Sequence, residues 1–105
     1  MQKTEAAIIE YLRDDDRRRE RRLQCQTPAE VILVQLGYSY PGTILDASSR
    51  GLRVRAARHV GAGWEVQIRI GQAIARGEVR YCTESSVPRM YEFGVLVYDV
   101  KNPVR

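Results

Sequence analysis

WEVQIRIGQAIARGEVRY occupies residues 64–81, and apolar and polar side chains alternate along most of this stretch. Successive side chains of a β-strand point to opposite faces of a sheet, so this period of two predicts strands with one face in the core. The same alternation recurs on both sides of the stretch, and turn-forming residues separate the repeats. The sequence predicts six strands, at about residues 29–36, 43–45, 52–56, 64–70, 75–81 and 91–97.

Local patterns add detail to this prediction. GYSYPG at residues 37–42 is rich in turn formers, so the first two strands are expected to form a hairpin. Residues 4–13 contain good helix formers, with Thr4 available as an N-cap, and predict a short helix. Four aromatic residues fall on positions of the alternating strands that we expect to face the core: Trp64, Tyr81, Tyr91 and Phe93.

Six short strands without a long helix between them indicate an antiparallel barrel or sandwich instead of a parallel α/β sheet. A closed barrel is favoured because it removes the sheet edges that six strands in an open sheet would expose. We therefore expect a mainly all-β fold, a six-stranded antiparallel β-barrel with a short N-terminal helix. The expected divisions are a helix and linker at 1–16, the barrel at 17–100 and a tail at 101–105.

Length and composition restrict the function. With 105 residues, 44% of them hydrophobic, the chain suffices for one domain and one core, which excludes most enzyme architectures. It has no apolar run of about 18 residues and no secretory signal, so we expect a cytoplasmic protein without a membrane span. Cys25 and Cys82 are then expected to be reduced, and with His59 as the single histidine we expect no metal site.

The basic residues are mostly arginine, 15 of 17, which suits recognition of phosphates and guanine but also follows from a GC-rich genome. DDDRRRERR at residues 14–22 has no apolar member, so it must lie on the surface or form a flexible arm. Alone, this run would be read as a solvated charge cluster. A second polar segment, DASSRG at residues 46–51, joins the second and third predicted strands, where Ser48 is expected to cap the turn. Hairpin pairing of the first two strands brings Asp46 near the arginine run.

Together these two segments resemble the PilZ family, bacterial domains with an RxxxR motif followed, a strand pair later, by [D/N]xSxxG. DASSRG supplies the second motif through Asp46, Ser48 and Gly51. RxxxR fits in two registers, Arg17 with Arg21 or Arg18 with Arg22, and the spacing to Pro28 favours the second. The resemblance extends over about residues 17–98 and includes GEVRY and YEFGVLV, with Tyr81 where members often carry Trp.

The resemblance implies a receptor for the second messenger cyclic di-GMP, with a six-stranded barrel of the PilZ type and no enzymatic activity. Arg18 and Arg22 would bind phosphates and the guanine O6 and N7 edge, while Asp46 would accept the guanine N1 and N2 hydrogens. Ser48 would add a polar contact, and Gly51 would permit a positive φ and close approach of the backbone to the ligand. The resemblance also implies that Arg17 helps to hold two intercalated ligands, and by their position in the sequence Arg19 and Arg50 are candidates for additional phosphate contacts.

For the mechanism, we expect an arm at about residues 14–26 that is mobile without ligand, closes over it and so alters a surface for an unidentified downstream protein. Two alternatives stay open: a PilZ-like adaptor that binds no nucleotide, and a barrel that binds single-stranded nucleic acid. The second is disfavoured because the sequence offers no evident exposed stacking residues. Ser48, His59 and Asp46 could be written as a catalytic triad, but their spacing on one turn argues against it.

Overall fold

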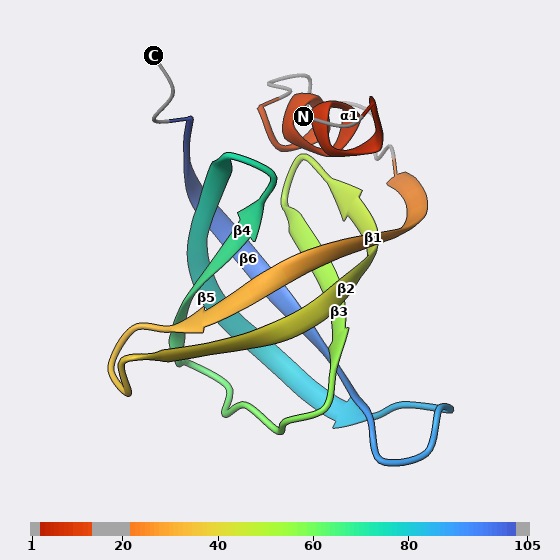
Figure 1. Ribbon diagram of the computed structural model, residues 1–105, viewed down its shortest axis with the longest axis vertical. Helices are drawn as coiled ribbons and strands as arrows, with labels where there is room; N and C mark the ends of the chain where they lie inside the picture. Colours follow the sequence, from red (N-terminus) through yellow and green to blue (C-terminus); the bar gives the residue numbers. More distant parts are fainter. Residues whose placement is uncertain (1–2, 14–21, 103–105) are drawn as a thin grey trace.

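The computed structural model describes residues 3–13 and 22–102, and within them it contains one helix and six strands (Figure 1). This confirms the predicted number of strands, their antiparallel pairing and the short N-terminal helix. The helix begins one residue before the predicted start. The elements are α1 (Lys3–Leu12), β1 (Arg22–Leu33), β2 (Tyr38–Ser48), β3 (Gly51–Ala56), β4 (Glu65–Ile70), β5 (Ala73–Glu84) and β6 (Tyr91–Lys101).

The six strands form one sheet in the order β1-β2-β3-β6-β5-β4, and this order closes into a barrel because β4 also pairs with β1. Glu30 to Leu33 of β1 lie antiparallel to Val66 to Arg69 of β4. Each strand therefore has a neighbour on both sides, which leaves no full-length strand edge exposed. Two pairings join strands that are not consecutive in the sequence, β1 with β4 and β3 with β6, and the second brings Gly51 opposite Leu96.

The core lies inside the closed sheet and follows from the alternation in the sequence. Along β3 and β4 every second residue is buried: Leu52, Val54 and Ala56, then Val66, Ile68 and Ile70. Helix α1 lies across one end of the barrel (Figure 1) and buries Ile8 and Ile9 in the same apolar cluster. Its apolar face thus closes this end from water, which is the main stabilisation available to a helix of ten residues. Helix α1, the one helix among the described residues, could not cross a membrane.

The first hairpin differs from the prediction. Strand β1 begins at Arg22, not near residue 29, and the turn lies at residues 34–37, so the predicted turn at 37–42 is wrong. Gly37, with φ of +74°, makes the turn, and Tyr38 onward already pairs with β1. The turn was predicted too late in the sequence because Pro41 is a residue typical of turns. Strand β2 tolerates this proline because it pairs with β3 only from Gly42 onward.

Two of the four aromatic residues expected in the core lie at the surface. Phe93 is fully buried and Tyr91 is half-buried, but Trp64 and Tyr81 are 43% and 44% exposed. Trp64 precedes the first residue of β4, so the pleat does not fix its direction. In β5 the register against β6 shifts between Val79 and Tyr81, which adds one residue and turns Tyr81 outward.

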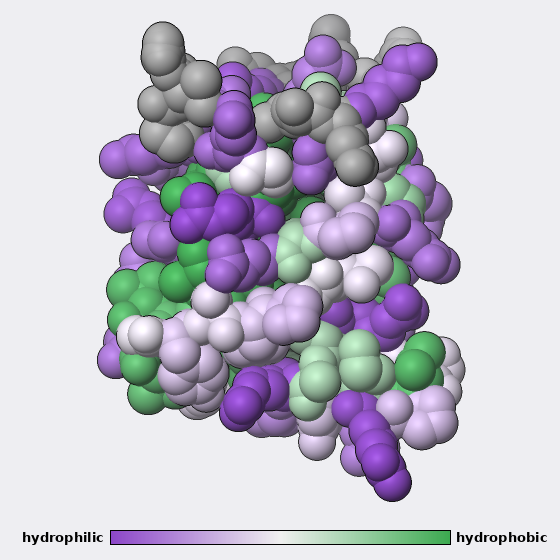
Figure 2. Space-filling view, viewed as in Figure 1, coloured by the Kyte–Doolittle hydropathy of each residue, from purple (hydrophilic) through white to green (hydrophobic). Residues whose placement is uncertain are grey.

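The surface is mixed in polarity. On the face shown in Figure 2, hydrophilic side chains are spread over most of the molecule, and hydrophobic ones gather at the lower left, near the β1–β2 turn of Figure 1. Val34 and Leu36 of this turn are exposed. Cys25 and Cys82 are free thiols, as predicted, and the Cys25 thiol donates to the carbonyl oxygen of Ile44 at 3.5 Å.

The Tyr40 hydroxyl is buried and has no hydrogen-bond partner among the described residues. Burial raises the pKa of Tyr40 to about 12, above the usual value of 10. Since an unpaired buried hydroxyl is costly, Tyr40→Phe is expected to raise the free energy of unfolding by about 1 kcal/mol. The unfolded chain ionises first as pH rises, so wild-type stability falls between pH 10 and about 12, and the advantage of the variant grows over that window.

Chemical denaturation at pH 7, 10 and 11.5 measures both effects. Tyr38→Phe is the matched control, because Tyr38 is 41% exposed and its hydroxyl can bind water. A Tyr40→Phe variant that is less stable than wild type at pH 7 would show that the hydroxyl has a stabilising partner, contrary to this account.

Candidate functional site

The turn between β2 and β3 carries the DASSRG segment. Asp46 and Ser48 lie in the last residues of β2, and Gly51 begins β3, so the segment is mostly strand with a short turn at residues 49–50. The Ser48 hydroxyl accepts a hydrogen bond from the Arg50 backbone N–H at 3.2 Å, which confirms that Ser48 caps the turn. The Arg50 carbonyl accepts from the Val97 N–H at 3.2 Å and ties the turn to β6.

The pairing of β1 with β2 brings the end of the arginine run to this turn. Arg22 lies opposite Ser48 and Gln24 lies opposite Asp46. The Arg22 Nη1 atom is 3.6 Å from Asp46 Oδ1, and its side chain remains 61% exposed. The predicted approach of the two motifs is therefore confirmed for Arg22. The other arginines named from the sequence, Arg17, Arg18, Arg19 and Arg21, lie outside the described residues.

Asp46 is the centre of an ion-pair chain that the sequence did not predict. Its side chain is only 6% exposed, and Oδ2 accepts a hydrogen bond from Arg53 Nε at 2.8 Å. Arg53 Nη1 also donates to Glu92 Oε1 at 2.9 Å. The hydrogen bond to Asp46, and to a smaller extent the one to Glu92, raises the pKa of Arg53 above its usual value, so this guanidinium is always charged. Arg53 is the register partner of Asp46 across the β2–β3 turn.

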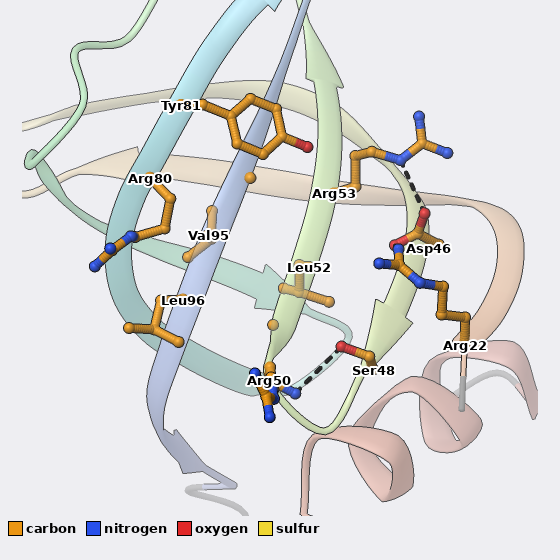
Figure 3. Close-up of a pocket in the computed structure, with 12 residues that line it drawn as sticks. Arg22, Asp46, Ser48, Arg50, Leu52, Arg53, Arg80, Tyr81, Val95 and Leu96 are labelled. Carbon is orange, nitrogen blue, oxygen red and sulfur yellow. Dashed lines mark hydrogen bonds and ion pairs between the residues drawn. The ribbon is translucent and has the colours of Figure 1, made fainter. Parts of the chain in front are cut away.

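Asp46 and Arg53 border an open pocket of about 240 Å³. Figure 3 shows Asp46 between Arg53 and Arg22 on one side, with Tyr81 and Arg80 on the other. Apolar side chains of β3 and β6, Leu52, Val95 and Leu96, also line it. A shallow surface with arginines, an aromatic ring and apolar side chains suits a planar anion that binds partly exposed to water. The complete lining is Arg22, Asp46, Ser48, Arg50, Gly51, Leu52, Arg53, Arg80, Tyr81, Gly94, Val95 and Leu96.

Tyr81 lies directly over Gly94 of β6. A methyl group placed on Gly94 would collide with the Tyr81 ring, so the ring rests on the glycine backbone. The bulge in β5 and the missing side chain at Gly94 together hold an aromatic face in the pocket wall. Arg80 and Tyr81 were not predicted as site residues, because strict alternation placed Tyr81 in the core.

Gly51 has a different role from the expected one. Among the described glycines, Gly37, Gly63 and Gly71 have positive φ values, and Gly51 does not. A Cβ atom on Gly51 would instead collide with the carbonyl oxygen of Val95 on the neighbouring strand. Gly51 is thus required because β3 and β6 approach closely beside the pocket, and the expectation of a positive φ is wrong.

Other candidate residues lie apart from this chemistry. The imidazole of His59 packs edge-on against Tyr91, with ring centroids 5.5 Å apart, while Asp46 is engaged by two arginines. Within residues 3–13 and 22–102, no three His, Cys, Asp or Glu side chains are grouped so that they could hold a metal ion. The geometry therefore defines a small β-domain with an open pocket lined by four arginines and Asp46, and His59 is not among the residues that line it.

Comparison with known protein families identifies the family of this small β-domain. The model of the PilZ domain matches residues 16–102, which is most of the chain. The chain therefore belongs to the PilZ domain family. A search of curated proteins finds no match.

Proposed function

We propose that this domain binds cyclic di-GMP at the pocket between the β2–β3 turn and β5–β6, and passes on its occupancy to a partner protein. PilZ domains are generally cyclic di-GMP receptors. The observation that carries the proposal is the meeting of both sequence motifs at one pocket: Arg22 lies 3.6 Å from Asp46 and both line it with Ser48.

Base recognition is assigned to Asp46. Guanine presents two adjacent donors, N1–H and the N2 amino group, which match the two oxygens of a carboxylate. Adenine has an acceptor at N1 and lacks the N2 amino group, so the same carboxylate disfavours it. Ser48, whose oxygen already accepts from Arg50, can supply its hydroxyl hydrogen to the ligand.

The phosphates are assigned to arginines. Arg22, Arg50 and Arg80 all line the pocket, and a guanidinium can bind two phosphate oxygens at once. At about 240 Å³ the pocket is smaller than the roughly 300–1,000 Å³ of typical ligand sites, so described residues cover part of a dinucleotide. We propose that Arg18, with Arg17 and Arg19, contacts the remainder. In this proposal Arg17 favours two intercalated ligands.

Tyr81 is assigned as the platform on which a guanine stacks. Base–aromatic stacking contributes about 1–3 kcal/mol, so Tyr81→Ala is expected to weaken cyclic di-GMP binding about tenfold, while Tyr81→Phe keeps the ring and the affinity. Isothermal titration of both variants measures this. Trp64→Ala is the control, because Trp64 is as exposed as Tyr81 but lines a different pocket. Equal losses for Tyr81→Ala and Trp64→Ala would contradict the assignment.

Transmission to a partner is assigned to the segment that precedes β1. Residues 22–26 of the expected mobile arm belong to β1, and residues 22–24 pair with β2, so we restrict the proposed arm to residues 14–21. We propose that the arginines before Arg22 close over the ligand and change the surface beside α1. Increased amide protection of residues 14–21 at saturating ligand is the expected result, and unchanged exchange there would contradict it.

Calorimetric titration of the purified chain with cyclic di-GMP tests the function. We expect saturable binding, with a molar ratio of two if Arg17 holds an intercalated pair and of one if it does not. Cyclic di-AMP is the matched control and should bind at least tenfold more weakly. Absence of binding at a high cyclic di-GMP concentration would overturn the proposal and favour the hypothesis of an adaptor that binds no nucleotide.

Single-stranded nucleic acid is a second candidate ligand. It was disfavoured because the sequence offered no evident exposed stacking residues, but the structure exposes two aromatic side chains. Tyr81 and Trp64 are both exposed and could stack on bases. An oligonucleotide ligand would bind more tightly with increasing length and lose affinity steeply with salt, whereas a dinucleotide with two charges would show a weak salt dependence. Titrations at two salt concentrations separate the two candidates.

A further inference from the structure

The carboxylate of Asp46 is held by an arginine that lies outside both sequence motifs. Arg53 lies on β3, and its side chain is 33% exposed, while that of Arg22 is 61% exposed. Its Nε atom lies 2.8 Å from Asp46 Oδ2, compared with 3.6 Å between Arg22 Nη1 and Asp46 Oδ1. Arg53 is therefore the closer and better shielded of the two partners.

Arg53 is itself fixed at a second point. Its Nη1 atom donates to Glu92 Oε1 at 2.9 Å, and the other oxygen of Glu92 accepts from the Ser85 hydroxyl at 3.4 Å. A planar guanidinium bound at two edges cannot rotate freely, so the Asp46 oxygen that it binds is also fixed. This arrangement sets the plane of the carboxylate before any ligand arrives.

The carboxylate nevertheless keeps acceptor capacity. Its two oxygens offer about four lone-pair positions, and the hydrogen bond from Arg53 uses one of them. A buried carboxylate also needs a nearby cation at all times. Because Arg53 meets this need, the more exposed Arg22 can turn toward a phosphate without leaving the Asp46 charge unpaired.

We propose that Arg53 is a positioning residue for guanine recognition, which acts by holding the Asp46 carboxylate in the orientation that accepts the guanine N1 and N2 hydrogens. The proposal rests on the proposed binding of cyclic di-GMP and adds a residue that neither motif contains. Glu92 supports Arg53 in this role through the hydrogen bond to Nη1.

The test compares two ligands that differ at one position. Cyclic di-IMP lacks the N2 amino group of cyclic di-GMP. The ratio of the two affinities therefore reports the strength of the hydrogen bond from this amino group to the Asp46 carboxylate. Wild type should prefer cyclic di-GMP about tenfold, the worth of a hydrogen bond to a charged acceptor. Arg53→Gln should weaken cyclic di-GMP binding about tenfold and reduce the ratio toward one. A general loss of stability would weaken both ligands equally and leave the ratio unchanged.

Arg55→Gln is the matched control, since it removes the same charge from the next outward-facing position of β3. It should leave the ratio at its wild-type value. Arg53→Lys keeps the positive charge but lacks the planar guanidinium that donates to both Asp46 and Glu92. It should also reduce the ratio, and it serves as the test variant if Arg53→Gln does not fold. An unchanged ratio in a folded Arg53 variant, or tighter binding, would overturn this proposal alone. Failure of wild type to bind cyclic di-GMP would overturn the proposed function together with it.

Discussion

Asp46→Ala is expected to weaken cyclic di-GMP binding by about 100-fold or more. The variant removes both acceptor oxygens that are assigned to the guanine N1 and N2 donors. Hydrogen bonds to a charged group contribute about 1.5–3 kcal/mol each, and about 2.8 kcal/mol corresponds to a factor of 100. The side chain is 6% exposed, so water cannot take the place of the lost acceptor. This is the largest effect on binding that the site predicts.

Isothermal titration measures this loss, and thermal unfolding shows whether the fold survives. Asp99→Ala is the matched control, because Asp99 forms an ion pair with Arg76 at 3.6 Å in a partly exposed position outside the pocket. That variant should bind as wild type does. If Asp46→Ala remained folded and bound cyclic di-GMP within threefold of wild type, the assignment of base recognition to Asp46 would be wrong.

Among the variants proposed, Gly51→Ala is expected to cause the largest loss in the free energy of unfolding. The added methyl group would collide with the Val95 carbonyl oxygen, which belongs to backbone and cannot move aside without separating β3 from β6. Overpacking of this kind costs about 3 kcal/mol. In a domain of this size that loss lowers the unfolding temperature by roughly 10–20 °C. Because Gly51 lines the pocket, the displaced strands should also weaken binding.

Differential scanning calorimetry of Gly51→Ala measures the shift. Ser49→Ala, in the same turn, is the control and should change the unfolding temperature by a few degrees at most. A Gly51→Ala variant with the unfolding temperature of wild type would show that β3 and β6 do not approach as closely as described.

The period of two along the chain was enough to predict six strands and their antiparallel arrangement, but not the bounds of the first two, which begin at Arg22 and Tyr38. The inward positions of β3 and β4 follow the alternation without exception. The same reasoning brought Arg22 to Asp46, because pairing across a hairpin is a local consequence of its turn. The prediction failed at Pro41, where the proline lies on the part of β2 that has no β3 neighbour.

The parts of the site that the sequence did not predict depend on pairing between distant strands. Glu92 reaches Arg53 because β6 lies beside β3, which no local pattern specifies. Tyr81 faces the pocket because a register shift interrupts the alternation of β5. Arg53 alone could have been found from the sequence. The two residues of the turn, 49 and 50, place it across from Asp46 once the hairpin is assumed.

Binding of cyclic di-GMP at this pocket is measured most directly by titrating the isotope-labelled chain with the ligand and following its amide resonances. Saturable shifts are expected to be largest at Ser48, Gly51, Tyr81 and Gly94, which line the pocket. Leu36 and Trp64, which line a separate pocket, should shift little. Saturable shifts centred on Leu36 and Trp64, or no shifts at high ligand concentration, would contradict the assignment of this pocket to cyclic di-GMP.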